Sequence, residues 1–189
     1  MRLIALGGSL RAASWNQRIA EIAGRGAAAA GAEVTVLRLH EFPMPLFNED
    51  EESASGPPEG ALALRTAFRE HDGLILGVPE YNGGPPAALK NAIDWLSRPQ
   101  EGFGRLDCFA GKVCALVSCS PGALGGIRGL PITRTILSSL GMHVIPAQHC
   151  LSGVHECFDE HGEPCNEQAT AALEGVGRAV AEATVRLRG

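Results

Sequence analysis

The sequence has few aromatic residues, little net charge and no long apolar run. Its 189 residues include one Tyr, two Trp and six Phe, and the formal net charge is -5. This mildly acidic balance argues against a protein that binds the phosphate backbone of nucleic acids. The longest span without Asp, Glu, Lys or Arg, residues 135–155, contains too many polar side chains to cross a bilayer. We therefore expect a soluble protein with neither nucleic acid nor membrane as a partner.

The sequence also lacks the signatures of disorder, secretion and a disulfide framework. Hydrophobic residues make up 45%, which is too many for extended disorder. The apolar start of the chain is interrupted by Gly7-Gly8-Ser9 and Arg11, too early for a secretory leader. A chain of this length can bury a core without cross-links, so the six Cys do not require pairing. We expect a cytoplasmic protein with one domain over residues 1–189.

Five short apolar runs are typical of strands buried on both faces of a parallel sheet. They cover residues 3–6, 34–39, 74–78, 113–117 and 143–145. Helical segments separate and follow them, beginning near Ser14, Pro57, Pro85 and Gly125, with a last one from Asn166 to Arg186. Strict alternation of this kind predicts a doubly wound α/β layer.

Local signals mark several of the segment boundaries. Ser14 followed by Gln17 forms the pattern of a capping box at a helix N-terminus. Pro131 is compatible with a helix only in an early turn, or where the regular helix starts around it. The acidic segment from Asn48 to Glu59 contains Ser, Gly and Pro, and we interpret it as a mobile surface loop.

Three loops that follow predicted strands carry the candidate chemistry, because ligands of open α/β sheets bind beyond the carboxyl ends of the strands. Residues 7–16 combine glycines, hydroxyls, a guanidinium and a helix N-terminus, which suits an anion. Residues 79–86 contain the only Tyr and suit a flat heterocycle. Residues 118–126 are small and allow close approach to the backbone. Taken singly, each loop is also compatible with an ordinary turn.

The three loops together resemble the NAD(P)H-dependent FMN reductases of flavodoxin-like fold, which include quinone, azo-dye and chromate reductases. The matching segments are GSLRAASWN at residues 8–16, PEYN and LKNAIDWLSR within residues 79–98, and SCSPGALGGIR at residues 118–128. The resemblance covers residues 1 to about 150. It implies a flavodoxin-like, doubly wound, five-stranded parallel sheet of order 2-1-3-4-5 with helices on both faces.

The resemblance also implies a cofactor site. The FMN phosphate would be held by Ser9, Arg11, Ser14 and Asn16, with help from the Trp15 backbone. The isoalloxazine would be lined by Pro79, Glu80, Tyr81, Asn82 and Gly83, and Ser120 with its neighbours would close the other side. Many relatives carry bulkier residues where this chain has Gly83-Gly84-Pro85, so the departure concerns the substrate side of the pocket.

A cluster of His and Cys near the C-terminus contains residue types that bind zinc or copper. Its members are His149, Cys150, His155, Cys157, His161 and Cys165. Their spacing contains no C-x-x-C pair and matches no common structural zinc site, so we expect no metal. A metal-handling protein therefore remains the weakest of the functional hypotheses.

The leading hypothesis is an enzyme that takes hydride from NADPH or NADH onto FMN and passes electrons to a small acceptor. The acceptor would be a quinone, an azo compound or a metal oxyanion, with ping-pong kinetics and no catalytic side chain, because the flavin carries the chemistry. The resemblance adds a homodimer or homotetramer. The alternative is a flavodoxin-like electron carrier. A carrier would shield its flavin with aromatic rings, so the scarcity of aromatics favours the enzyme.

Overall fold

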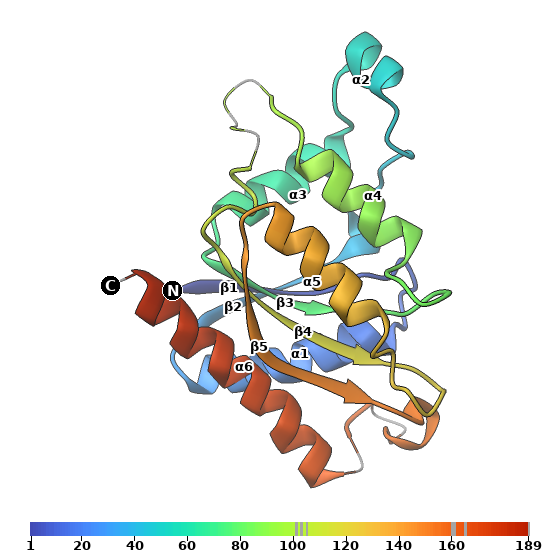
Figure 1. Ribbon diagram of the computed structural model, residues 1–189, viewed down its shortest axis with the longest axis vertical. Coiled ribbons are helices and arrows are strands. Elements are labelled where there is room, and N and C mark those ends of the chain that lie inside the picture. Colours follow the sequence, from blue (N-terminus) through green and yellow to red (C-terminus); the bar gives the residue numbers. More distant parts are fainter. Residues whose placement is uncertain (101, 103, 105, 160–161, 165, 189) are drawn as a thin grey trace.

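The computed structural model describes residues 1–100, 102, 104, 106–159, 162–164 and 166–188. Five parallel strands form one sheet in the order β2-β1-β3-β4-β5 (Figure 1). The strands are β1 (Arg2–Gly7), β2 (Glu33–Arg38), β3 (Gly73–Gly77), β4 (Val113–Cys119) and β5 (His143–Leu151). The predicted fold class and strand order are confirmed.

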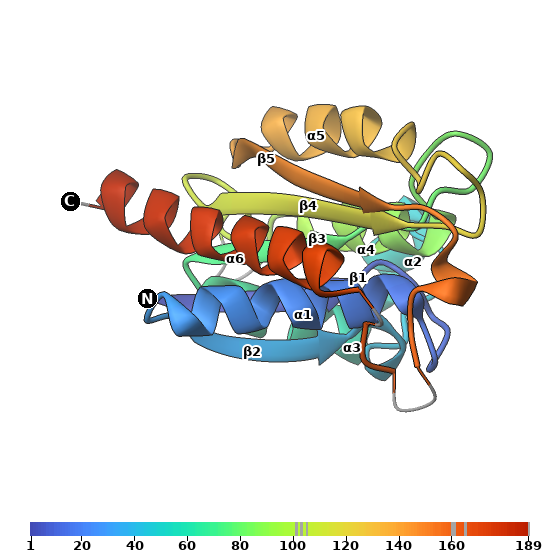
Figure 2. The ribbon, with the colours of Figure 1, turned by 90° about the horizontal axis from the view of Figure 1, so that it is seen from below.

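Helices cover both faces of this sheet, because alternate residues of each strand point to opposite sides. On one face, α1 (Trp15–Ala29) and α6 (Glu167–Arg188) lie side by side (Figure 2). Their side chains pack with Leu3, Ile75 and Ala115. The other face carries α3 (Glu59–Arg69), α4 (Ala87–Leu96) and α5 (Gly129–Ser139). Apart from Arg2 in β1, the central strands are buried, whereas the edge strands β2 and β5 are only partly buried.

Two helix starts show how the local signals operate. Pro131 lies in the first turn of α5, where its missing N–H removes no intrahelical bond. The Ser14 hydroxyl accepts a hydrogen bond from the Gln17 N–H (3.3 Å), which is half of the predicted capping box. The Gln17 side chain does not complete the box, because its Oε1 accepts from the Gly7 N–H (2.6 Å). The N-terminus of α1 is thereby tied to the end of β1.

The interpretation of residues 48–59 as a mobile loop was wrong. The segment contains the helix α2 (Glu49–Ser55), and its last residue begins α3. Asn48 caps α2, and four acidic residues occupy its first turn, where the helix dipole favours negative charge. Arg98 adds ion pairs to Glu49 (3.1 Å) and Glu52 (2.8 Å). A cluster of acidic residues thus stabilises this short exposed helix.

The fifth strand is longer than the predicted residues 143–145. It passes through Pro146 and continues to Leu151, with a register shift against β4 between Cys114 and Leu116. Proline is tolerated at such an irregularity in an edge strand, where its missing N–H breaks no regular ladder. The extension carries the chain to the same edge of the sheet as the ends of β1, β3 and β4. There it enters the short helix η2 (Val154–Glu156).

In the described part of the chain, no helix is both long enough and apolar enough to cross a membrane.

Candidate functional site

The loop after β1 presents unused hydrogen-bond donors at the N-terminus of α1. The first helical residues are Trp15 and Asn16, and no acceptor in the described part of the chain bonds their backbone N–H groups. The Ser9 hydroxyl accepts from the Arg11 N–H (3.2 Å), which bends the loop around this helix end. Free N–H groups at a helix N-terminus, together with hydroxyls and a guanidinium, suit a phosphate.

The same helix end is fastened to β4 by the side chain of Asn16. Its Nδ2 donates to the Cys119 carbonyl and its Oδ1 accepts from the Cys119 N–H, both at 3.0 Å. The residue is 7% exposed. Both polar atoms of the side-chain amide are therefore hydrogen-bonded to the backbone at the end of β4. Only the backbone N–H of Asn16 is available to bind an anion. Gly77 lies close by, and an added Cβ there would come 2.0 Å from the Asn16 carbonyl oxygen.

The loop after β3 closes in a tight turn. Tyr81 and Gly84 exchange two backbone hydrogen bonds of 2.9 and 3.2 Å. Asn82 and Gly83, between them, have φ values of 55° and 83°. Two successive positive φ values define a type I′ turn, for which Asn-Gly is the preferred sequence. The turn leaves the Tyr81 side chain at the surface, 56% exposed.

Glu80 joins this loop to the start of α5. Its carboxylate accepts from the Arg128 backbone N–H (3.0 Å) and from Arg128 Nε (2.7 Å), and it also pairs with Nη2. The Glu80 side chain is 6% exposed, whereas that of Arg128 is 63% exposed. Burial acts to raise the pKa of Glu80, but the hydrogen bonds and charge of Arg128 outweigh it and hold the pKa below its usual value. Glu80 is therefore an anion at neutral pH.

The loop after β4 completes the site. The Ser118 hydroxyl donates to the Val78 carbonyl (2.6 Å), which ties the ends of β3 and β4 together. Ser120 bonds through its backbone to Leu151 and Val154, both at 3.2 Å. These contacts place η2 beside the loops that follow β1, β3 and β4.

One cavity lies between these segments. It is lined by Ser9, Arg11, Ser14, Trp15, Asn16, Pro79, Glu80, Tyr81, Cys119, Ser120, Pro121, Val154 and His155. Nine of the eleven predicted cofactor-binding residues therefore lie around a single cavity. The other two, Asn82 and Gly83, form the tip of the neighbouring turn and are not among its lining residues.

Two of the other four lining residues, Cys119 and Pro121, are the neighbours that were expected to close the site together with Ser120. Sequence reasoning missed the remaining two. Val154 and His155 were missed because the fifth strand was predicted to end at residue 145, too early to reach this edge. Had the end of β5 been predicted at Leu151, the rule that ligands bind beyond the carboxyl ends of strands would have pointed to Val154 and His155.

The thiols near the cavity are protonated at neutral pH. Burial, followed by the neighbouring Cys157 and Cys150, raises the pKa of Cys119 to about 12. Burial likewise raises the pKa of Cys150 and lowers that of His149. Among the described residues, no three His, Cys, Asp or Glu side chains form a group that could hold a metal. His161 and Cys165 lie outside the described residues.

The fold and the site define a flavodoxin-like α/β protein with one cavity at the carboxyl edge of its sheet, between the loops that follow β1, β3 and β4. Residues 1–156 match the family described as NADPH-dependent FMN reductase. The chain therefore belongs to this family, which confirms the family predicted from the loop sequences.

Relatives and solved structures agree with this assignment. A quinone reductase of Pseudomonas putida KT2440 is 37% identical over 158 residues, covering 82% of this chain and 80% of that protein. An NAD(P)H-dependent FMN reductase of Pseudomonas aeruginosa is 30% identical over 190 residues, covering 100% and 98%. The flavoenzyme FerB of Paracoccus denitrificans has a TM-score of 0.78 at 24% identity, covering 98% and 97% of the two chains. An archaeal flavodoxin has a TM-score of 0.63 at 13% identity, covering 98% and 99%. The structural likenesses concern the fold.

Proposed function

We propose that this protein is an NAD(P)H-dependent, FMN-containing oxidoreductase. It transfers hydride from NADPH or NADH to FMN and then reduces a quinone, an azo compound, a metal oxyanion or a similar small acceptor by a ping-pong mechanism. The family of the chain and the names of its relatives, quinone reductase and FMN reductase, support this proposal.

One observation carries the proposal: donors for a phosphate and a wall for a flat ring open into the same cavity. The N–H groups of Trp15 and Asn16 lie in the first turn of α1 and Arg11 lies in the loop before it, whereas Pro79 and Tyr81 lie in the loop after β3. This donor set fits a ligand that has a phosphate at one end and a planar heterocycle at the other. In our proposal, the residues that would hold FMN are the eleven predicted from the sequence. Bound FMN would supply the hydride chemistry.

The protein's own part is to hold the cofactor and leave one ring face open. The Trp15 ring stacks on Phe158 with centroids 4.7 Å apart, so it is already engaged in an aromatic contact. Tyr81 is then the aromatic side chain of the cavity that remains for the cofactor ring, and it is largely exposed. Donor and acceptor substrates would use the open face in turn. Glu80 is ionised and Cys119 is protonated at neutral pH, and we assign no catalytic side chain.

We also propose that residues 1–189 act as one FMN-binding domain in a homodimer or homotetramer. The apolar stripe of α4 does not supply the contact surface, because Leu89, Ala92, Ile93 and Leu96 are buried within the chain. An apolar groove beside α4 has exposed walls instead, at Leu10 (58% exposed) and Leu46 (76% exposed). Light scattering tests this part, and a monomer would contradict it.

The absorbance spectrum of the purified protein, with and without FMN and NADPH, tests the proposed function. We expect a bound flavin spectrum that is bleached by NADPH or NADH and restored by a quinone. A flavodoxin-like carrier would bind FMN without rapid bleaching by either nucleotide. Failure to bind FMN would reject both functions.

A further inference from the structure

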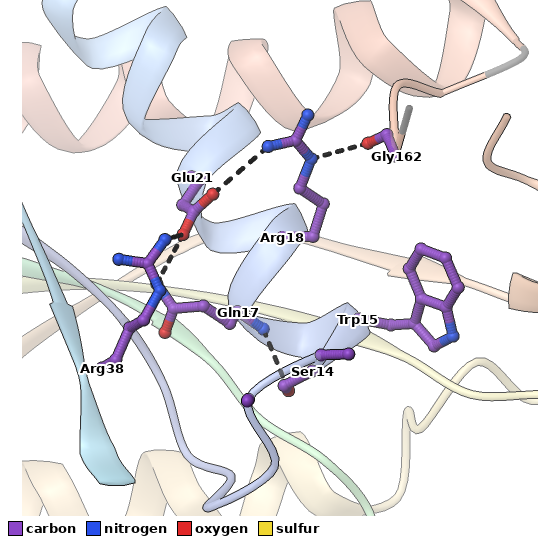
Figure 3. Close-up of a pocket in the computed structure, with 9 residues that line it drawn as sticks. Ser14, Trp15, Gln17, Arg18, Glu21, Arg38 and Gly162 are labelled. Carbon is purple, nitrogen blue, oxygen red and sulfur yellow. Dashed lines mark hydrogen bonds and ion pairs between the residues drawn. The ribbon is translucent and has the colours of Figure 1, made fainter. Parts of the chain in front are cut away.

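A second cavity, of about 270 Å³, adjoins the first at the N-terminus of α1 (Figure 3). Ser14 and Trp15 line both cavities, so they share a wall. The second cavity is otherwise walled by Ala12, Ala13, the α1 side chains Gln17, Arg18 and Glu21, the backbone of Gly162, and Arg38 at the end of β2. The second cavity therefore lies next to the β1 loop, on the other side of Ser14 and Trp15.

Among the described residues around this second cavity, positive charge is in excess. Glu21 lies between two guanidinium groups, accepting from Arg38 at 2.8 Å and from Arg18 at 3.4 Å (Figure 3). Arg18 also pairs with Glu163, which in turn pairs with Arg25 at 2.9 Å. Three guanidinium groups thus share two carboxylates. The side chains of Arg18 and Arg38 are 31% and 41% exposed, so both remain accessible to an incoming anion.

The remaining features of this cavity suit a nucleoside. Trp15 is one of the lining residues, and its ring is fixed by a stack on Phe158 with an interplanar angle of 17°. Glu21 is an acceptor that ribose hydroxyls could use. Arg38 ends β2, which is where doubly wound dinucleotide-binding folds place an arginine against a ribose phosphate. A guanidinium, a carboxylate and an indole together match phosphate, ribose and base.

We infer that the Arg18–Arg38 cavity binds the adenosine phosphate portion of a nucleotide cofactor. This inference rests on the proposed function, because it places that portion beside the flavin phosphate. Two molecules carry the required chemistry. One is FAD, whose adenylate would follow the flavin phosphate into the cavity, and the other is NADPH, whose adenosine carries a 2′-phosphate.

Two titrations distinguish these sources. In the first, flavin-free protein is titrated with FMN and with FAD, and the ratio of the two dissociation constants is compared between wild type and Arg38→Glu. In the second, FMN-loaded protein is titrated with 2′-phospho-ADP-ribose. Arg178→Glu on α6 makes the same charge change at an exposed position that does not line the cavity and serves as the control. Arg38→Met removes the charge but keeps the apolar stem, and it replaces Arg38→Glu if that variant does not fold.

We expect Arg38→Glu to raise the dissociation constant of one of these ligands by about tenfold or more, because its phosphate loses a charge-assisted contact. FMN affinity should change little, and the control should match wild type. A selective loss of FAD affinity assigns the cavity to the adenylate of FAD. A selective loss of 2′-phospho-ADP-ribose affinity assigns it to NADPH. If FMN binds and neither ligand responds to Arg38, this inference alone is overturned. If wild type does not bind FMN, the proposed function falls with it.

Discussion

The two ends of the first cavity are built in different ways. At the phosphate end, the loop is held by buried hydrogen bonds: Gln17 to Gly7, and Asn16 to the backbone of Cys119. At the ring end, a two-residue turn and the partly exposed pair of Glu80 with Arg128 hold Tyr81 at the surface. Buried polar contacts cost much more to break than exposed ion pairs. The comparison predicts that substitutions at the phosphate end destabilise the fold, whereas those at the ring end have smaller effects.

The largest effect is expected for Asn16→Ala. It removes both hydrogen bonds to Cys119 and leaves a buried N–H and C=O without partners, so the free energy of unfolding should fall by about 2–4 kcal/mol. Urea denaturation measures this change. Asn48→Ala, which removes the cap of the exposed helix α2, should cost about 1 kcal/mol or less. If the two variants lose the same free energy of unfolding, the buried hydrogen bonds do not make the phosphate end more costly to disrupt.

Arg11→Ala tests binding at the same end without disturbing the buried contacts. We expect FMN affinity to fall by about 1.5–3 kcal/mol, or roughly 10- to 150-fold, because the phosphate loses a charge-assisted partner. Quenching of FMN fluorescence on titration measures the dissociation constant. Arg178→Ala on α6 is the control and should bind FMN as wild type does. An unchanged affinity in Arg11→Ala would show that the loop is misassigned.

At the ring end, Gly83→Ala should lower the free energy of unfolding by about 1–2 kcal/mol. The φ of 83° at this position is unfavourable for any residue with a Cβ. Gly84→Ala is the matched control, since an added Cβ there would meet only Ile132 Cδ1 at 3.8 Å. Thermal unfolding of the two variants gives the difference. If Gly83→Ala is as stable as Gly84→Ala, the turn adopts another conformation.

The smallest effect is expected for Arg128→Ala, about 1 kcal/mol or less at neutral pH, because the arginine is largely exposed. The pH dependence of stability is more informative. The pKa of Glu80 is lower in the folded state than in the unfolded state, so its contribution to stability is present above the unfolded-state pKa and is lost as the pH falls through the folded-state pKa. Stability measured from neutral pH to about pH 3 should show this loss in wild type. The stability of Glu80→Gln should fall less over this pH range. If the stability of the variant and of wild type depends on pH in the same way, the assigned pKa shift is contradicted.

Much of the site could be predicted because its signals are local. Apolar runs located the ends of β1, β3 and β4, and the small and polar residues after them marked three loops that meet at one cavity. The segment from residue 48 to 59 was misread because its acidic residues look like a solvated loop. Helix α2 also pairs with Arg98, 46 positions away from Glu52, and such a distant contact leaves no local signal. The end of β5 was missed because Pro146 resembles a strand terminator.

The sequence by itself determined the family, the alternation of strands and helices, and the residue types at the carboxyl edge of the sheet. These follow from hydrophobic periodicity and turn chemistry, which act over a few residues. Only the tertiary structure decided what each side chain contacts. Asn16 meets Cys119 across 103 positions, Glu80 meets Arg128 across 48, and Arg38 reaches Glu21 from the next strand. Such contacts depend on strand order and register, which bring distant segments together only when the whole sheet has formed.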